Sequence, residues 1–310
     1  MQHFRVITFS DRELNEANPL IHTCKSNGLP IDVVTLTEDW KVNAFKIKLL
    51  YDYLQNKSED MILLVVDAFD VIINCKTDQI LSLFRSFKTD IVFAAEANYY
   101  FRNPKLRGKY FKNYPSSPTI YRFLNSGTFI GTCWALKALL QDIISENNLN
   151  PEDLSTFIAV RSDQYLYSKH FVDSASHKNP RYNIILDYNH ELFEVTGGRM
   201  RVLHLPYLSD LHAYNAYKVE RFLLKTFNLH HHQDAITDLT FDPDKSTFKN
   251  RLCNTYPPII HFPGTWHNFD SVLSKLKTKS KTFSWGKSAA SAMSLIAYLI
   301  GLFIPIRIKL

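Results

Sequence analysis

Asp67 and Asp70 are three positions apart near the end of the segment Met61–Val71, MILLVVDAFDV. The apolar run before Asp67 predicts a strand buried on both faces, as in a parallel sheet covered by helices. Open α/β sheets bind ligands beyond the carboxyl ends of their strands, where these carboxylates would lie. Such oxygen ligands suit Mg²⁺ or Mn²⁺, which share them with substrate phosphates. Alternatively, Asp67 caps a turn and Asp70 is solvated, and the spacing leaves both interpretations open.

Polar residues also interrupt the apolar segment Tyr121–Gly131, YRFLNSGTFIG. We expect Asn125–Gly127 to form a turn between two apolar segments, because Asn, Ser and Gly are common turn residues. Further along, Ser162 precedes an aromatic segment and is a candidate helix N-cap. Asp163 then either rests against the positive end of that helix or takes part in catalysis. The residues alone leave both roles open.

Lys46 and His261 are candidate site residues only if the fold brings them to the two carboxylates. Lys46 lies off the apolar stripe of a helix expected over residues 38–54. It is either a solvated lysine or a cation near a phosphate site. His261 ends the expected strand Pro257–His261, where it is either an ordinary surface residue or a partner of the carboxylates.

The elements that must position these residues alternate between strand and helix. Further strands are expected at Phe4–Phe9, Ile31–Leu36, Asp90–Ala95, Thr128–Cys133, Tyr182–Leu186 and Met200–His204. Further helices are expected at Asp78–Phe87 and Trp134–Glu146, and Ser10 or Asp11 is expected to cap the first helix. The segment Ala97–Ile120 is expected to be a long loop whose aromatic side chains either stack on sugars or pack. The alternation predicts a mostly parallel sheet in a three-layer α/β/α sandwich.

The composition is that of an ordinary globular protein. The 310 residues are 45% hydrophobic and 21% charged, enough apolar material for one large core or two modest ones. The formal charge of +6 is concentrated in a lysine-rich stretch near the C-terminus, so no nucleic-acid-binding surface is expected. The four cysteines include no CxxC pair, and the first residues lack the features of a signal peptide. We therefore expect a cytoplasmic catalytic domain.

The C-terminal region differs from the rest in composition. Residues 271–287 form a basic linker, and residues 288–306 carry no charged side chain. This length is at the lower edge of what spans a bilayer, with basic residues on both sides to sit among headgroups. The segment is expected to be a transmembrane helix, with an interfacial helix or a helix docked on the domain as alternatives. Association with a membrane is therefore one of the predictions.

Five ordered motifs, VVDAFDV, FAAEANYY, YRFLNSGTFIG, SDQYLY and IIHFPG, resemble the glycosyltransferase domain of the procollagen lysyl hydroxylase family. They resemble the collagen-type galactosyltransferases more loosely. The resemblance extends over Phe4–Asn268 and is poor over residues 205–256, so we expect one domain over residues 1–270 with a poorly matched insertion. It implies a GT-A fold, in which a Rossmann-like α/β sheet binds a UDP-sugar together with Mn²⁺ or Mg²⁺. The hydrophobic tail follows this domain.

The resemblance also implies roles for the residues that match the family's motifs. The metal would be held by Asp67, Asp70 and His261. The donor pocket would be formed by Thr8, Trp40, Lys46, Phe69, Ser126, Gly127, Gly264 and His267. Asn125 and Asp163 would lie on the acceptor side, with Asp163 as our candidate for orienting the acceptor. Two departures stand out: the family's acidic run is reduced to Asp163, and His267 takes the place of a lysine.

These expectations combine into a metal-dependent glycosyltransferase that moves glucose or galactose from a UDP-sugar to an acceptor hydroxyl, with retention of configuration. The acceptor, whether protein, lipid or glycan, is not predicted. The alternative is a catalytically silent nucleotide-sugar binder or membrane-anchored scaffold, which the reduced acidic run favours. A nucleotidyltransferase would use a similar acidic strand end, but the segment after the first strand lacks the glycine- and lysine-rich loop it needs.

Overall fold

The structure, a computed structural model, describes residues 3–36, 40–99, 106–175, 180–196, 219, 226 and 239–263. Several predicted features lie outside these residues: Gly264, His267, the strand Met200–His204, most of the insertion 205–256, the linker 271–287 and the segment 288–306. Among the described residues, no helix is both long enough and apolar enough to cross a bilayer. The domain limits and the nature of the tail stay predictions.

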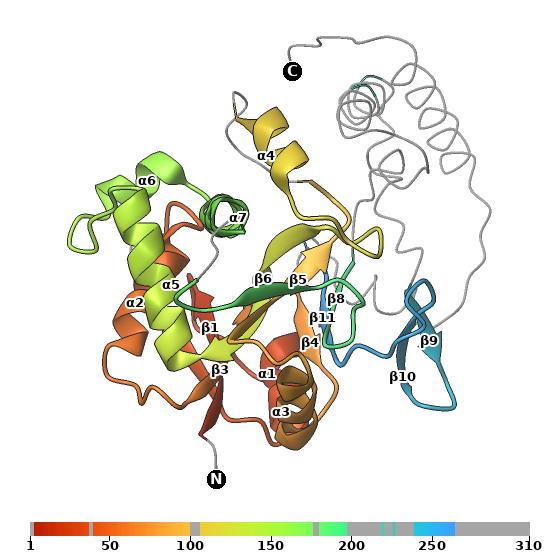
Figure 1. Ribbon diagram of the computed structural model, residues 1–310. Helices are drawn as coiled ribbons and strands as arrows, with labels where there is room; N and C mark the ends of the chain where they lie inside the picture. The colour runs from red at the N-terminus through yellow and green to blue at the C-terminus, as the bar shows by residue number, and fades with distance from the viewer. Residues whose placement is uncertain are drawn as a thin grey trace.

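Helices and strands largely alternate over residues 4–146, whereas the later described elements come as a run of helices and then a run of strands (Figure 1). The strands are β1 (Phe4–Ser10), β2 (Ile31–Thr35), β3 (Ile62–Asp67), β4 (Val71–Ile73), β5 (Ile91–Glu96), β6 (Phe123–Thr132), β7 (Ile184–Asp187), β8 (Phe193–Val195), β9 (Leu239–Asp242), β10 (Thr247–Asn250) and β11 (Ile259–His261). The helices are α1 (Pro19–Ser26), α2 (Phe45–Leu54), α3 (Thr77–Ser86), α4 (Arg107–Asn113), α5 (Cys133–Glu146), α6 (Ser155–Val160) and α7 (Asp163–Ser174). Most predicted elements agree closely with these bounds, although α2 begins later than expected.

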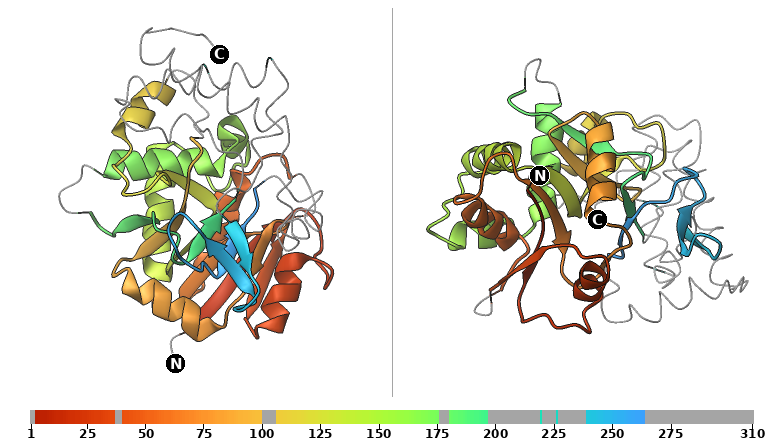
Figure 2. Two further views of the ribbon diagram at one scale, coloured as in Figure 1. Left: turned by 90° about the vertical axis from the view of Figure 1, so that its right-hand side faces the viewer. Right: turned by 90° about the horizontal axis from the view of Figure 1, so that it is seen from below.

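A six-stranded sheet in the order β2-β1-β3-β6-β5-β7 forms the centre of the fold. The strand β6 runs antiparallel to β3 and β5, whereas the pairs β1–β2, β1–β3 and β5–β7 are parallel. Helices cover both faces (Figure 1, Figure 2): α2, α5 and α7 bury apolar residues in one cluster, and α1 and α3 do so in another. The predicted mostly parallel sheet in a three-layer α/β/α sandwich is confirmed.

The strand β3 shows why its apolar run is unbroken. Leu63 and Val65 pack in the cluster that contains α2 and α5, whereas Leu64 and Val66 pack with α1 and α3. Successive side chains of a strand point to opposite faces, so a strand between two helical layers needs apolar residues at every position. The run is followed by Asp67, the last residue of β3, which lies at the carboxyl end of the strand, where α/β sheets bind ligands.

The chain passes from the central sheet to a second sheet through Ala68–Asp70. The next strand, β4, pairs antiparallel with β11, which pairs parallel with β8. This strand was not expected from the sequence, in which Met61–Val71 suggests a single strand. Asp67 is consequently the last residue of β3, and Asp70 ends the connection that leads to the second sheet.

The predicted Asn-Ser-Gly turn is wrong, because these residues belong to the continuous strand β6. Its pairing with β5 shifts in register: Phe93 pairs with Phe129, whereas Ala94 pairs with Asn125. The residues between these two partners, Ser126–Thr128, form a bulge on β6. Bulges bend a strand and redirect its side chains, and they are frequent beside active sites. The turn-forming residues Ser126 and Gly127 thus lie where β6 has no ladder partner on either side.

The predicted cap of the first helix is also wrong. Asn18, rather than Ser10 or Asp11, is the N-cap of α1. Its side-chain oxygen accepts hydrogen bonds from the backbone N–H groups of Leu20 and Ile21 at 3.0 and 3.1 Å. The helix starts later because Pro19, whose fixed φ suits the first helical position, follows Asn18 directly.

The described part of Ala97–Ile120 contains the helix α4 and closely packed aromatic rings. Tyr99, Phe111 and Tyr114 are all buried, with ring centroids between 5.0 and 5.5 Å from that of Phe123. These spacings are those of ordinary aromatic pairs in a core. Of the two roles left open by the sequence, these three rings therefore have the packing role.

Candidate functional site

The three predicted metal ligands meet where the two sheets join. Asp67 ends β3 and Asp70 precedes β4, while His261 ends β11. In the β4–β11 ladder His261 pairs with Val71, and the N–H of Phe262 donates to the carbonyl of Asp70 at 2.8 Å. Strand pairing, rather than nearness in the sequence, therefore places the imidazole beside the carboxylates.

The geometry of these ligands fits a divalent cation. The Nε2 atom of His261 lies 3.5 Å from Asp67 Oδ2 and 3.4 Å from Asp70 Oδ1, and the three ligand atoms lie within 4.8 Å of one another. His261 is 2% exposed, yet its Nε2 has no hydrogen-bond partner. A buried unpaired nitrogen costs free energy, so such a group calls for a ligand. Two carboxylates and one imidazole supply the mixed oxygen and nitrogen ligands that divalent metal ions accept.

The other side of the imidazole is held by Asn125 and Glu96. The Nδ1 of His261 lies 3.0 Å from Asn125 Oδ1. Because an amide oxygen only accepts, Nδ1 carries the hydrogen, and Nε2 is left to face the carboxylates. Asn125 donates in turn to Glu96 at 3.0 Å, and Gln164 donates to the same oxygen at 2.8 Å. Outer hydrogen bonds of this kind fix the orientation of metal-binding histidines.

Two buried groups at the site have shifted pKa values. Burial raises the pKa of Glu96 to about 7, although hydrogen bonds from two amide side chains oppose the shift. Burial alone would lower the pKa of His261, but the carboxylates of Asp70 and Asp67 raise it above its ordinary value. A cation at Nε2 requires that nitrogen to be deprotonated, so metal binding here would release a proton.

Gly127 makes room for His261. A Cβ at position 127 would lie only 2.1 Å from His261 Cε1, far inside any real contact distance. The backbone N–H of Gly127 also donates to Asn125 Oδ1 at 2.9 Å. The bulge of β6 thus supplies both the space for the imidazole and a hydrogen bond to its amide partner. The resemblance implied a role for Gly127 at the donor sugar, and the structure places it against the predicted metal ligand.

Lys46 joins the carboxylates instead of facing solvent. Its ammonium pairs with Asp67 Oδ1 and lies 3.7 Å from Asp163 Oδ2. Burial alone would lower the pKa of Lys46, but these two carboxylates raise it above its ordinary value. Ser126 donates to Asp163 Oδ2 at 3.2 Å, and Ser162 is the N-cap of α7, as predicted. Lys46 is therefore a cation that links Asp67 to Asp163.

A cavity of about 380 Å³ adjoins this cluster. It is lined by Phe9, Asp11, Arg12, Trp40, Asn43, Lys46, Asp67, Ala68, Phe69, Asp70, His261 and Pro263. The guanidinium of Arg12 lies 4.8 Å from the centre of the Phe69 ring. The cavity thus combines aromatic walls with cations and carboxylates in one place.

The predicted donor-pocket residues divide into those that line this cavity and those that do not. Trp40, Lys46 and Phe69 line it. Thr8 does not, since it is fully buried and its hydroxyl donates to the carbonyl of Val66 at 2.8 Å inside the sheet. Side chains alternate along β1, so the next residue, Phe9, lines the cavity instead.

The predicted acceptor-side residues are buried next to the cavity rather than exposed in its wall. Asp163 is 4% exposed and Asn125 is 3% exposed. Burial raises the pKa of Asp163, while the ammonium of Lys46 opposes the shift. Both residues contact side chains that do line the cavity, Asp163 through Lys46 and Asn125 through His261.

Sequence reasoning missed Glu96, Arg12 and Asn43 as residues of the site. Glu96 ends the buried strand β5, just as Asp67 ends β3, so the same rule applied to both strands would have found it. Arg12 and Asn43 lie outside the described helices and strands, where no periodicity marks a residue. Their place in the cavity wall follows from the path of the chain after β1 and before α2.

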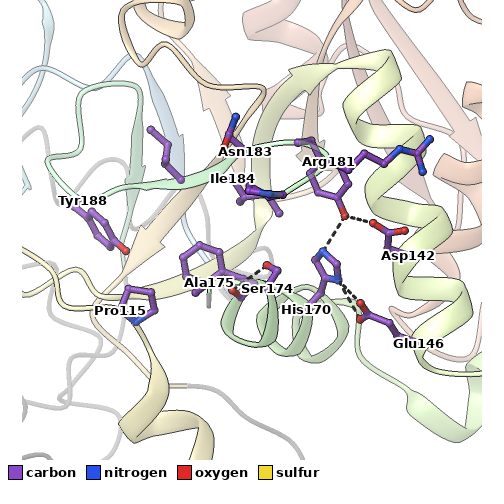
Figure 3. A pocket seen from close by; sticks show the side chains of 14 residues that line it. Pro115, Asp142, Glu146, His170, Ser174, Ala175, Arg181, Asn183, Ile184 and Tyr188 are labelled. Carbon is purple, nitrogen blue, oxygen red and sulfur yellow. Dashed lines mark hydrogen bonds and ion pairs between the residues drawn. The ribbon is translucent and has the colours of Figure 1, made fainter. Parts of the chain in front are cut away.

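A larger cavity, of about 560 Å³, lies beside α5, α7 and β7 (Figure 3). Tyr182 donates to Asp142 at 2.7 Å, and His170 lies 2.9 Å from the Tyr182 hydroxyl and 3.0 Å from Glu146 (Figure 3). These four side chains are already paired with one another. Size alone therefore does not make this cavity the candidate site, and its lining shares no residue with the cavity at Asp67.

Most of the residues described above lie in the part of the chain that matches a known family. The family model of the PLOD GT domain matches residues 1–221, which include Asp67, Asp70 and Asp163. The chain belongs to this glycosyltransferase-domain family. Membership confirms the resemblance drawn from the motifs, and the mixed α/β sheet is of the GT-A type that the resemblance implied. His261 lies beyond the matched residues, so its convergence with the carboxylates is information that the structure adds.

Individual relatives of the PLOD family show how far the likeness extends. Procollagen-lysine,2-oxoglutarate 5-dioxygenase 1 of Gallus gallus is 30% identical over 180 residues, 55% of this chain and 22% of that protein. The Homo sapiens protein of the same name is 27% identical over 204 residues, 63% of this chain and 25% of that protein. The matched region thus spans about a quarter of these relatives' length.

A solved structure also aligns with the chain. It is the crystal structure of a glycosyltransferase involved in the glycosylation of the major capsid of PBCV-1. The alignment covers 88% of this chain and 98% of that chain, with 11% identity and a TM-score of 0.38. A score this low does not by itself establish a shared fold.

Proposed function

We propose that this protein is a metal-dependent glycosyltransferase that transfers glucose or galactose from a UDP-sugar to an acceptor hydroxyl. The observation that carries the proposal is the buried Nε2 of His261, which faces Asp67 and Asp70 without a hydrogen-bond partner. A divalent cation is the ligand whose chemistry matches these groups, and Mn²⁺ and Mg²⁺ are the ions usually shared with phosphates.

The cavity beside these residues supports a nucleoside diphosphate donor. A bound Mn²⁺ or Mg²⁺ would neutralise the charge that develops on the departing diphosphate. Lys46 brings a second positive charge to the same cavity, and its neighbouring carboxylates keep it protonated. Trp40 and Phe69 provide aromatic surfaces suited to the planar uracil ring.

The acceptor side of the proposal depends on Asp163. Ser126 donates to its carboxylate and Lys46 lies beside it, so its oxygens are held in a defined direction. In the proposed reaction Asp163 orients the acceptor hydroxyl, and the family resemblance favours retention at the anomeric carbon. The anomeric configuration of the product, read by NMR, tests retention directly.

The test of the enzyme proposal measures UDP released by the full chain from a series of UDP-hexoses, with and without Mn²⁺. Water serves as the acceptor until the natural one is known. We expect turnover with UDP-glucose or UDP-galactose that EDTA abolishes and Mn²⁺ restores. Asp67→Asn should abolish it, whereas Asp60→Asn, at an exposed position before β3, should retain it. Turnover that is unchanged by EDTA would contradict the proposal.

A second candidate function is a catalytically silent nucleotide-sugar binder. The burial of Asp163 and its pairing with Lys46 favour it, because a buried carboxylate does not meet an acceptor without movement. Calorimetric binding of a UDP-hexose with Mn²⁺, combined with no turnover of any donor, would support this function over the first. Membrane attachment through residues 288–306 and a cytoplasmic location stay predictions.

A further inference from the structure

Asp67 presents its two oxygens to two different neighbours. The Oδ1 atom takes the ammonium of Lys46, whereas Oδ2 faces the Nε2 of His261 at 3.5 Å. The side of Oδ2 is where the ligand atoms of Asp67, Asp70 and His261 converge. Asp67 is thus shared between a cation built into the chain and the position expected for a metal ion.

The charges around Lys46 depend strongly on its ammonium. Asp67 and Asp163 contact it, and Asp70 also acts on it electrostatically. The formal charge of the three carboxylates and the ammonium together is −2, and without Lys46 the formal charge of the three carboxylates is −3. One divalent cation neutralises the charge of −2 that is present with Lys46. Lys46 therefore opposes the binding of a bare cation, yet makes the occupied site more favourable for an anionic diphosphate.

The ammonium has little freedom to leave this position through movement of its helix. Lys46 lies in the first turn of α2, between Phe45 and Ile47, which are 1% and 0% exposed in the core. The side chain of Lys46 is itself 17% exposed and that of Asp163 is 5% exposed. Partial burial weakens solvent screening, so these charges act on one another more strongly than surface charges would.

We propose that Lys46 makes metal binding depend on the donor. In the free protein its ammonium neutralises Asp67 and weakens the affinity for a bare cation. When a nucleoside diphosphate enters, the ammonium turns from Asp67 towards the diphosphate and opposes the cation less, so the cation and the diphosphate bind cooperatively. This inference rests on the proposed function, since it presupposes a metal ion at Asp67, Asp70 and His261 and a UDP-containing donor.

The experiment is a calorimetric titration of Mn²⁺ into the full chain, with and without UDP, for the wild type and two variants. Lys46→Met removes the ammonium. Lys48→Met is the matched control, because Lys48 lies in the same helix but pairs with Asp52 at 2.5 Å away from the site. In the wild type, UDP should raise the Mn²⁺ affinity by about tenfold or more. Lys46→Met should bind Mn²⁺ alone about tenfold more tightly than the wild type, and UDP should raise its Mn²⁺ affinity by a smaller factor than in the wild type.

The outcomes separate this inference from the proposed function. A folded Lys46→Met variant that binds Mn²⁺ alone no more tightly than the wild type, or that keeps the full effect of UDP, overturns the inference. Wild-type protein that binds no Mn²⁺ even with UDP overturns the metal site itself. Lys46→Gln, which removes the charge but keeps a polar end, replaces Lys46→Met if circular dichroism shows that variant to be unfolded.

Discussion

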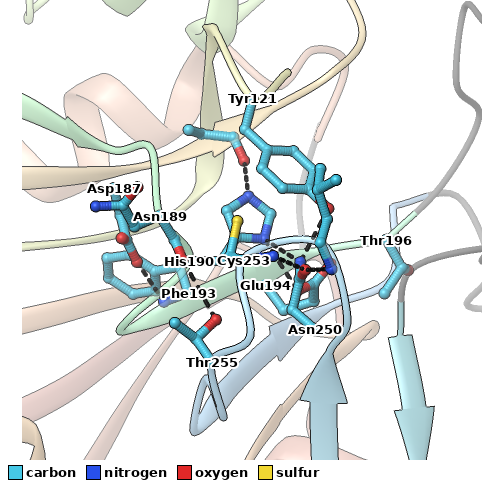
Figure 4. A network of polar contacts seen from close by, with 12 residues as sticks. Tyr121, Asp187, Asn189, His190, Phe193, Glu194, Thr196, Asn250, Cys253 and Thr255 are labelled. Carbon is cyan, nitrogen blue, oxygen red and sulfur yellow. Dashed lines mark hydrogen bonds and ion pairs between the residues drawn. The ribbon is translucent and has the colours of Figure 1, made fainter. Parts of the chain in front are cut away.

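Two buried histidines, His261 and His190, show how one kind of side chain serves binding in one region and structure in another. His190 is fully buried, with Nδ1 2.9 Å from Glu194 and Nε2 2.9 Å from the carbonyl of Ala95 (Figure 4). A carboxylate and a carbonyl only accept, so both nitrogens carry a hydrogen. Burial alone would lower the pKa of His190, but Glu194 raises it above its ordinary value.

The network around His190 is closed by Asn250 and Tyr121. Asn250 donates to Glu194 at 2.8 Å and to the hydroxyl of Tyr121 at 2.9 Å, and the Tyr121 ring stacks on His190 with centroids 3.5 Å apart (Figure 4). Both ring nitrogens of His190 are therefore paired within the protein, which joins β5, β8 and β10. At His261 only Nδ1 is hydrogen-bonded, and Nε2 faces two carboxylates without a hydrogen bond. An incomplete network at a buried histidine marks a ligand site, and a complete one marks a structural contact.

The largest expected effect is on the metal affinity of the His261→Ala variant. Removing one of three ligands should weaken Mn²⁺ binding in the presence of UDP by about thousandfold, beyond the 10–100-fold typical of outer-shell changes. The measurement is calorimetry. His22→Ala, at an exposed position on α1, is the control and should bind as the wild type does. An affinity near that of the wild type in His261→Ala would remove the distinction between the two histidines.

The matching change in the other region is His190→Ala, which should act on stability. It leaves the Glu194 carboxylate buried without its partner, so the free energy of unfolding should fall by about 3 kcal/mol or more. Urea denaturation measures the loss. Because His190 does not touch the three ligands, the Mn²⁺ affinity of the folded protein should be unchanged. A loss of affinity equal to that of His261→Ala would show that the two regions are not separate.

A smaller effect is expected for Gly127→Ala, which sharpens the comparison without removing a ligand. The new Cβ would displace the imidazole of His261, so Mn²⁺ affinity should fall by about hundredfold. Gly131→Ala is the matched control on the same strand, since its Cβ would meet the carbonyl of Asp90 at 3.0 Å, away from the site. That control should lose stability but keep its affinity. Equal affinities in the two variants would contradict the role of Gly127.

The smallest effect is a pH dependence of stability that arises from Glu96. Its pKa is about 7 in the folded protein against an ordinary 4.5, so between these values the folded state holds a proton that the unfolded state has lost. Stability should therefore fall as pH rises through this range, by roughly 1 kcal/mol per pH unit. Urea denaturation from pH 4.5 to pH 7 should show the same slope in the wild type and in Glu59→Gln, at an exposed position, and a slope changed by roughly 1 kcal/mol per pH unit in Glu96→Gln. A slope in Glu96→Gln equal to that of the wild type would contradict the role of Glu96.

The sequence predicted the parts of the site that depend on local pattern. The apolar run into Asp67 gave both a buried strand and a carboxylate at its end, and Ser162 was correctly expected as a helix cap. The motifs also led to Lys46, although its residue type and position alone left a solvated lysine as the more common alternative. The sequence did not show that Thr8 lies inside the sheet rather than in the cavity wall, because the direction of a side chain at a strand end depends on the exact register.

Other features escaped prediction because they arise from contacts between distant segments. The strand β4 is short and forms only because β11 pairs with it. The bulge of β6 looks like a turn in the sequence, since Asn, Ser and Gly have the same local preferences in both settings. The strand-end rule would have found Glu96, but its hydrogen bonds with Asn125 and Gln164 join distant segments and could not be predicted from local pattern.

The sequence by itself determined which segments are strands and helices, that one sheet is buried on both faces, and that carboxylates stand at the end of its central strand. These properties follow from the alternation and runs of apolar residues, which are local. Only the tertiary structure decided that His261 meets Asp67 and Asp70, that Gly127 leaves space for it, and that Lys46 pairs with a metal-site carboxylate. The physical reason is that strand register and side-chain pairing are set by packing between segments far apart in the chain, which no local pattern encodes.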